Sequence, residues 1–445
     1  MGEAGPIAGE VYEGRSVHCT EVLLDRSQKG TSVRHFRRII ICAFAFLLLA
    51  PAQPAQAADR SDSDLVAGWL ARTLASNNDL AITPAGDVDY ASTAYALIGL
   101  RAAGVAGDQI AASAKAMAAS GDSFVGAPDQ ADDKATAVSL MILAMSAGGL
   151  DPSHYAGVDG DRDLYADLES VVHEDGGVSS SPTAYGQSFA ILALLSSPGG
   201  VPDDALQWLL AQPCADTASP GYGGYGFSGP GSCDDADPDS TALAVIAAVA
   251  AGVPADVLEP SRAFLVSTQD PSGGFDSAFS GVNANTTGLA VAALNAVSPG
   301  SDEAAKGAQF LASLMYGCDL ASDPAASGLV GAMALTADSR ASTQIDPLAD
   351  ADRALFFQAS AQGIYGFIDK VINPSQMAPA SPDAPGTESC PATAGSADSA
   401  SPSSPAPADS AVDTGPNNWL WALGGFLVVV LVFIGWRFLL SARKP

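Results

Sequence analysis

The segment Arg262-Ala263-Phe264-Leu265 is followed by Gln269 and then by Gly273-Gly274-Phe275. Hydrophobic residues at helical spacing precede the glutamine and predict an amphipathic helix over residues 260–267. Glycine can take the positive φ angles that a sharp exit from a helix requires. The aromatic residue can then pack the turn onto a neighbouring element. We therefore interpret residues 260–275 as a surface helix that ends in a tight turn, which the aromatic residue holds against a neighbouring element.

A set of apolar segments recurs across residues 58–370 with a period of about 50 residues, which is in the range of helical repeat proteins. They are apolar nearly all the way round, which predicts helices that are buried on every side. Most begin at residues that cap helix N-termini and end near Gly, Ser or Pro. The segments are Asp89–Ala103, Asp133–Ala147, Pro182–Leu195, Asp239–Ala251, Asn285–Val297 and Ala326–Ala337.

Amphipathic segments alternate with the apolar ones and predict a second, outer set of helices. They are Asp64–Ala75, Asp108–Ala119, Asp163–Val172, Asp203–Ala211, Pro260–Ser267 and Asp302–Met315, with Asp350–Ala361 expected to close the domain. An open solenoid would leave one face of each inner helix exposed, and these helices are too apolar for that. We therefore predict an all-α fold, an (α/α)6 toroid of two concentric layers over residues 58–372.

Partial copies of the pattern in residues 262–275 occur elsewhere in the chain, and together they resemble a known family. The copies are Lys306–Leu311, then Trp208-Leu209 with Gln212 and Gly224–Phe227, and a degenerate one at His173–Val178. The pattern resembles the QW repeat of the terpenoid cyclase and protein prenyltransferase superfamily, in which an outer helix ends in Gln and a Gly-x-aromatic turn. The resemblance implies a toroid with parallel inner helices and a cavity at one mouth.

The catalytic motifs of that superfamily are missing from the sequence. It contains no Asp-x-Asp-Asp acid, no Asp-Asp-x-x-Asp magnesium motif and no fitting zinc set, and the acidic run Asp234–Asp239 has the wrong spacing. The run Asp159–Asp163 begins like a calcium loop but lacks the later Gly and Glu, so we interpret it as a solvated loop. We expect no metal ion and no cofactor.

Without those motifs, the resemblance implies a use like that of the cobalamin carriers, which bind a ligand on the toroid without catalysis. The small β-domain of those carriers has no counterpart here. We expect a non-catalytic binding domain for a small molecule, such as a corrinoid, or for a cell-envelope component. The alternatives are a structural or adhesive envelope protein and an enzyme of the terpenoid cyclase or prenyltransferase type.

A binding site is expected at the mouth formed by the N-termini of the inner helices. Tyr185 and Gln187 are the leading candidates, because they lie one turn inside a buried helix, where polar groups are costly to bury. For the Asp and Asn candidates, helix capping is the favoured explanation and ligand binding the alternative. The full set of candidate ligand-binding residues is Tyr185, Gln187, Asp89, Tyr90, Asp133, Asp239, Thr241, Asn285 and Thr287.

The N-terminal residues 1–57 are typical of a signal region. A basic patch at residues 34–38 precedes the apolar residues 39–49 and a small-residue cleavage site at Ala55-Gln56-Ala57. The apolar run is about half the length of a membrane span. We therefore expect export, with translation starting near residue 33 and the mature protein near residue 58.

The C-terminal residues predict attachment to the membrane. Residues 419–440 are interpreted as a single transmembrane helix, because 419–436 carries no charge and has tryptophans at its ends. The basic tail, residues 441–445, is then cytoplasmic and the domain extracellular. Residues 373–418 are expected to form a disordered stalk. Ala411–Gly415 resembles a sortase signal, so cell-wall attachment stands as an alternative to retention in the cell membrane.

Charge and cysteines limit the partners and the compartment. The chain has 49 Asp and Glu against 20 Lys and Arg, a net charge of −29, which argues against nucleic-acid binding. Outside the signal region, Cys214, Cys233, Cys318 and Cys390 predict two disulfides, for which three pairings can be drawn. We favour Cys214–Cys233, which closes a glycine-rich loop and leaves Cys318–Cys390. A zinc site is the weaker alternative, because the sequence has no CxxC pair.

Overall fold

The computed structural model describes residues 60–157, 160–226, 231–278, 280–324, 326–345, 347–373, 376–386 and 390. Helices dominate these residues, and the strands are only two or three residues long. The strands pair as short hairpins: β1 (Tyr155–Gly157) with β2 (Gly160–Arg162), β3 (Tyr225–Gly226) with β4 (Ala236–Asp237), and β5 (Phe275–Ser277) with β6 (Gly281–Asn283). The predicted all-α class is confirmed.

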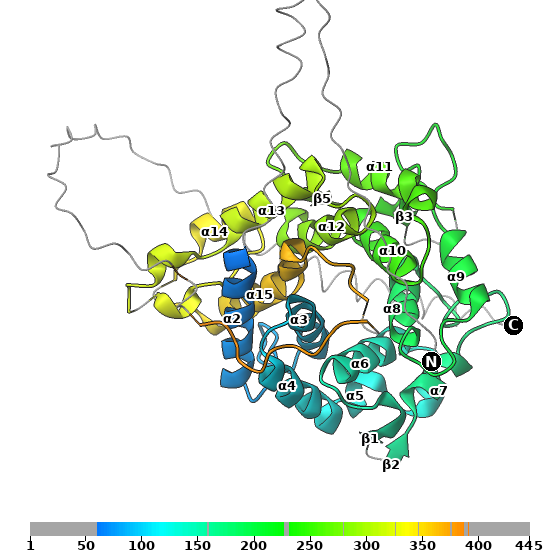
Figure 1. The fold of residues 1–445 in the computed structure, drawn as a ribbon, viewed down its shortest axis with the longest axis horizontal. Helices are drawn as coiled ribbons and strands as arrows, with labels where there is room; N and C mark the ends of the chain where they lie inside the picture. Colours follow the sequence, from blue (N-terminus) through cyan, green and yellow to red (C-terminus); the bar gives the residue numbers. More distant parts are fainter. Residues whose placement is uncertain are drawn as a thin grey trace, which may run out of the picture. The chain divides into compact units, whose positions relative to one another are not determined.

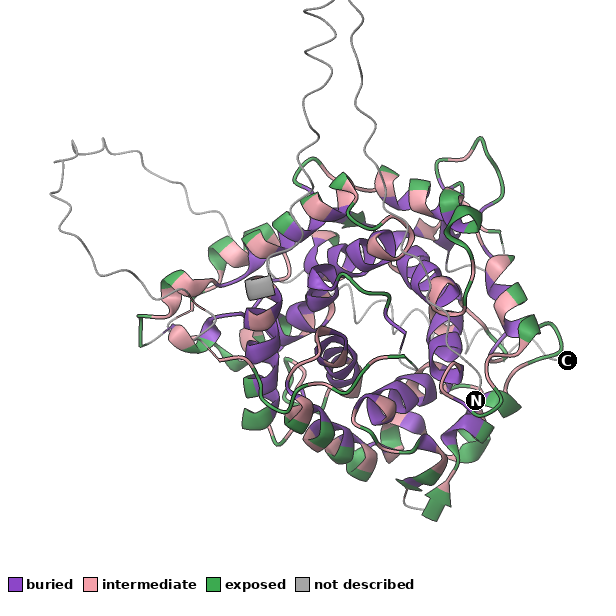
Figure 2. Ribbon diagram, viewed as in Figure 1, coloured by how far each residue is buried: buried purple, intermediate pink, exposed green. Residues whose placement is uncertain are grey.

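In the described part of the chain, six helices form a closed inner ring in which each helix contacts the next, and the last contacts the first (Figure 1). In order around the ring they are α3 (Tyr90–Ala103), α6 (Ala135–Ala147), α8 (Ala184–Leu194), α10 (Pro238–Ala250), α12 (Ala284–Val297) and α15 (Asp350–Gly363). The apolar sequences of the first five are explained by burial on nearly all sides, which Figure 2 shows as a nearly continuous inner circle. The sixth, α15, is amphipathic and leaves Asp350 and Leu355 exposed.

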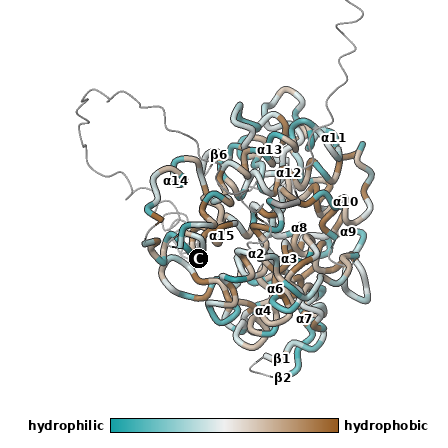
Figure 3. Tube along the Cα trace, turned by 60° about the vertical axis from the view of Figure 1, so that its left-hand side comes forward, coloured by the Kyte–Doolittle hydropathy of each residue, from teal (hydrophilic) through white to brown (hydrophobic). Residues whose placement is uncertain are grey.

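A second layer of helices surrounds the ring (Figure 1). These helices are α2 (Arg60–Ser76), α4 (Gly107–Ser120), α7 (Leu164–Ser170), α9 (Asp203–Leu210), α11 (Glu259–Ser267) and α13 (Asp302–Leu314), with shorter pieces at α5 (Asp122–Val125) and α14 (Ala337–Ser342). Their buried residues face the ring and their exposed residues face outward (Figure 2). Hydrophobic residues accordingly concentrate on inner helices such as α8 and α10 (Figure 3).

Gln269, which follows the helix α11, joins two repeats. Its Nε2 donates to the carbonyl of Gly273 at 2.9 Å and to the carbonyl of Glu303, in the first turn of α13, at 2.8 Å. Gly273 has a φ of +95°, and a Cβ added there would lie 2.5 Å from the carbonyl oxygen of Lys306 on the same helix. The turn therefore packs directly against the next outer helix.

The same turn recurs in four repeats and is bonded to the inner helix each time. The residue two positions after a positive-φ glycine donates its N–H to an inner-helix side chain at 2.8–2.9 Å. The donor and acceptor pairs are Val178 with Gln187, Tyr225 with Thr241, Phe275 with Thr287, and Met333 with Ser360. In each of these four repeats, the glycine turn therefore connects the inner helix, through this hydrogen bond, to the neighbouring outer helix, against which the glycine packs.

The predicted sixth inner helix over Ala326–Ala337 is wrong. That segment holds only the 3-10 turn η5 (Ser327–Leu329) and the fourth of these glycine turns, at Gly331. A Cβ on Gly331 would overlap the carbonyl oxygen of Leu65 on α2, so this turn packs the last repeat against the first outer helix. Its apolar residues are buried as a turn, and α15, which was expected to close the domain, is the sixth inner helix.

Both favoured disulfides are confirmed. Cys214 pairs with Cys233, with their Cα atoms 4.8 Å apart, and Cys318 pairs with Cys390, with their Cα atoms 5.4 Å apart. The first closes the loop before β4, and the second joins the loop after α13 to the end of the described chain. No zinc site is needed to explain these cysteines.

Residues 368–373 and 376–386, here called the strap, cross the face where the inner helices end (Figure 1). Asn373 Nδ2 donates to the carbonyl of Ala250 at the end of α10, at 3.0 Å. The Ser381 N–H donates to the carbonyl of Gly104 just after α3, at 2.9 Å. The chain that packs on the helices therefore extends beyond the predicted domain boundary at residue 372.

Within the part of the chain that the structure describes, no helix combines the length and the apolar character that crossing a bilayer requires. The signal region 1–57 and the segment 419–440, on which export and the transmembrane helix were predicted, lie outside the described residues.

Candidate functional site

Three of the predicted site residues occupy equivalent positions on neighbouring inner helices. Tyr185, Asp239 and Asn285 are the second residues of α8, α10 and α12, which adjoin one another in the ring. Equivalent positions at adjacent helix N-termini form one rim, and Asp239 is close enough to perturb the titration of Tyr185. We call this rim, Tyr185–Asp239–Asn285, the mouth.

A cluster of aromatic residues lies beneath the mouth. The hydroxyl of Tyr185 contacts the hydroxyl of Tyr95 on α3, and the hydroxyl of Tyr365 donates to the carbonyl of Tyr95 at 2.8 Å. Phe189 packs edge-on against Tyr185 and Tyr95, with ring centroids 5.2 Å and 5.6 Å apart. Burial raises the pKa of Tyr185 to about 12, so this phenol stays neutral and can donate or accept.

Asp239 is a carboxyl in an unusual environment. Burial, followed by the negative charge of Asp237, raises its pKa to about 7. A hydrogen bond with the Thr286 side chain acts in the opposite direction, but Oδ1 of Asp239 is buried and has no hydrogen-bond partner among the described residues, and the same is true of Oδ1 of Asn285. Buried polar atoms almost always have partners, so each exception needs an explanation. A ligand or solvent molecule that donates hydrogen bonds would supply the missing partners.

The raised pKa of Asp239 predicts a pH dependence of stability. The folded state holds this proton more tightly than the unfolded state, whose carboxyl has a pKa near 3.8, so the contribution is fully present below that value. It is lost as the pH rises from about 4 through 7, and the free energy of unfolding should fall over that range. Asp237, whose pKa burial also raises, acts in the same direction.

Urea denaturation of the Asp239→Asn variant checks this expectation. The variant cannot ionise at this position, so its stability should decline less between pH 4 and pH 7, by an amount on the order of 1 kcal/mol or more. Asp256→Asn removes an exposed carboxyl on the outer layer and serves as the control, with the wild-type decline. Identical pH profiles for wild type and Asp239→Asn would contradict the assignment.

Gln187, a leading candidate for ligand binding, uses its side-chain amide for hydrogen bonds within the fold. Its Oε1 accepts from the Val178 N–H, and its Nε2 donates to the carbonyls of Gly176 and Ala205, both at 2.9 Å. Val172 stands here at the position that Gln269 holds in its own repeat. Gln187 therefore supplies, from the inner helix, both the bond to the turn and the bond to the next outer helix.

Most of the other candidates also have structural partners. Thr241 and Thr287 accept from the glycine turns. The side chain of Asp89 caps α3 by accepting from the Ser92 N–H at 2.9 Å, while Tyr90 stacks on Phe124 and donates to the Ser120 carbonyl. Asp133 lies in the turn before α6. The structure thus brings Tyr185, Asp239 and Asn285 together and assigns the rest to helix ends and turns.

The axis of the ring is filled by side chains. A cavity of about 20 Å³ remains there, lined by Tyr95, Phe189 and Tyr365 together with aliphatic residues, including Ile372 from the strap. Pockets that hold small organic ligands have volumes of about 300–1,000 Å³. A ligand of that size therefore does not fit inside the ring.

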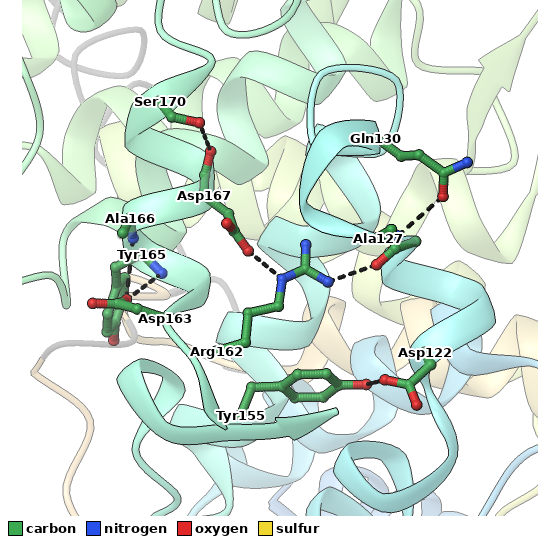
Figure 4. A network of polar contacts seen from close by, with 11 residues as sticks. Asp122, Ala127, Gln130, Tyr155, Arg162, Asp163, Tyr165, Ala166, Asp167 and Ser170 are labelled. Atoms are coloured by element: carbon green, nitrogen blue, oxygen red, sulfur yellow. Dashed lines mark hydrogen bonds and ion pairs between the residues drawn. The ribbon is translucent and has the colours of Figure 1, made fainter. Parts of the chain in front are cut away.

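A separate polar network lies outside the ring, around the run that resembles a calcium loop (Figure 4). Arg162 pairs with Asp167 and donates to the Gly126 carbonyl at 2.6 Å, and Tyr155 donates to Asp122 at 2.9 Å. These bonds fix the β1–β2 hairpin against the α5 region. Among the described residues, no group of three or more His, Cys, Asp or Glu side chains is arranged to hold a metal ion.

Comparison with known proteins does not show a family for this chain. No family model and no curated protein matches the sequence. Among solved structures, a protein from Actinoplanes matches with a TM-score of 0.41 and 16% identity, covering 67% of this chain and 97% of that one. A likeness at this level bears on neither fold family nor function.

Proposed function

We propose that the chain is a non-catalytic binding domain on a terpenoid-cyclase-like α/α toroid, held at the cell surface, with its ligand over the mouth. The observation that carries the proposal is the pair of buried oxygens, Asp239 Oδ1 and Asn285 Oδ1, to which no residue described by the structure donates a hydrogen bond. The filled axis supports a scaffold role over an enzyme that encloses a terpenoid, because about 20 Å³ holds no such substrate.

The ligand class follows from the mouth's chemistry. Two oxygen acceptors beside the Tyr185 phenol suit a molecule that is rich in hydrogen-bond donors and broad enough to cover the rim. A corrinoid fits this description, because its periphery carries carboxamide groups whose N–H bonds are donors. The acidic charge of the chain also disfavours anionic ligands at this rim.

Calorimetric titration with cyanocobalamin tests the proposal. We expect saturable binding to protein purified from the membrane fraction, and about tenfold weaker binding by the Asp239→Ala variant, the equivalent of one hydrogen bond to a charged or buried group. Asp256→Ala, which removes an exposed carboxyl, should bind like wild type. Recovery of the protein in the soluble fraction would contradict the anchoring, and equal affinities of the two variants would contradict the site.

If no corrinoid and no other small molecule stabilises the protein against heat, the structural or adhesive role is favoured instead. Ligands that bind only the folded state stabilise it by an amount that grows with the logarithm of their concentration relative to Kd and so raise the melting temperature, and a flat response across a broad panel would be decisive.

A further inference from the structure

The opposite face of the ring contains a pocket of about 540 Å³, between the strap and the ends of α3 and α10. This volume lies within the range of sites that hold small organic ligands. Arg101, in the last turn of α3, and Lys370, on the strap, line it together with the amide of Gln376. Val249, Val371 and Met377 provide an apolar surface.

The charge of this pocket is opposite to that of the protein. No Asp or Glu is among the described residues that line it, although the chain has 49 acidic and 20 basic residues. The described residues give neither Arg101 nor Lys370 an ion-pair partner within 4 Å. Within the described ranges, Arg101 makes long hydrogen bonds, 3.3 Å and 3.4 Å, to the carbonyls of Ala147 and Met377.

Stabilisation of a helix end explains only part of this arrangement. A cation in the last turn of a helix interacts favourably with the helix dipole, which accounts for the position of Arg101. Lys370 belongs to the strap, outside any helix, and lines the same pocket as Arg101. Two cations on separate elements that face one pocket are suited to hold an anionic group between them.

We propose that this pocket binds a small amphiphilic anion, in which a carboxylate or phosphate lies between Arg101 and Lys370 and an apolar body lies on Val249, Val371 and Met377. The planar guanidinium can make two parallel hydrogen bonds to either oxyanion, while the lysine acts as a point charge. This site is distinct from the mouth, which is at the other ends of the inner helices.

Calorimetric titration of the full protein with octanoate and with octyl phosphate tests the proposal, with octanol and octyltrimethylammonium as matched neutral and cationic probes. We expect saturable binding of at least one anion, weakened by added salt, and no measurable binding of the cation. The more tightly bound of the two anions identifies the head group.

Variants locate the site. Lys370→Gln should weaken binding of the anion about tenfold, and Lys306→Gln, at an exposed lysine on α13, should leave it unchanged. Arg101→Lys should weaken octyl phosphate by losing the bidentate contact while retaining the charge. Asp239→Ala should have no effect here, which separates this site from the mouth. Octanol binding as tightly as the anions, or Lys370→Gln binding like wild type, would overturn the proposal.

Discussion

Replacing Gly331 with alanine should lower the free energy of unfolding by more than about 4 kcal/mol, among the largest effects expected of one substitution. Gly331 has a φ of +94°, which alanine adopts only with strain, and the added Cβ would overlap the backbone carbonyl of Leu65. A backbone atom cannot move aside as a flexible side chain can. Either α2 must move away from the turn or the turn must change conformation, and both break the contact between the last repeat and the first outer helix.

Chemical denaturation followed by circular dichroism measures this effect, and Gly252→Ala is the matched control. Gly252 has a similar φ of +89°, but nothing lies within 4 Å of its added Cβ. The control should therefore show only the backbone strain, about 1 kcal/mol. Equal destabilisation by the two variants would show that the contact with Leu65 does not contribute.

Gln187→Ala should cost at least about 3 kcal/mol of folding stability. The substitution leaves the N–H of Val178 and the carbonyls of Gly176 and Ala205 without their partner in a site where Gln187 is fully buried. Each buried polar group that loses its hydrogen bond costs about 1–3 kcal/mol. A ligand-binding role would predict the opposite pattern, with weaker binding and little change in stability.

The control for this variant is Gln207→Ala, which truncates an exposed glutamine on α9. It should change the unfolding free energy by no more than about 0.5 kcal/mol. Hydrogen exchange in the Gln187→Ala variant should be fastest around residues 176–178, where the turn is released. A loss of stability no larger than that of Gln207→Ala would contradict the structural role.

The two helical layers could be predicted because a helix buried on every side is apolar throughout, whereas a helix with one exposed face is amphipathic. An inner helix such as α6 is buried along residues 138–145 and is therefore apolar on every side. The same criterion failed at 326–337, because a buried glycine turn and a short buried helix have the same composition. The positive φ of Gly331 and its contact with Leu65, distant in sequence, decide between them.

The candidate site was predictable only in part. Asp239 and Asn285 were identified as polar residues at inner-helix N-termini, but helix capping was the favoured explanation, and the sequence does not show that Oδ1 of each lacks a partner among the described residues. Tyr95 and Tyr365 were missed, because the hydrogen bond between them spans 270 positions and leaves no local pattern. Gln187 was recognised as a polar residue that is costly to bury. The sequence signal that could have shown its structural role is Val172, which replaces the glutamine that the repeat has at Gln269.

Hydrogen–deuterium exchange with bound cyanocobalamin shows directly whether a ligand lies over the mouth. We expect slower exchange confined to the first turns of α8, α10 and α12, around Tyr185, Asp239 and Asn285. Protection confined to the strap and the ends of α3 and α10, or no protection at saturating ligand, would contradict it.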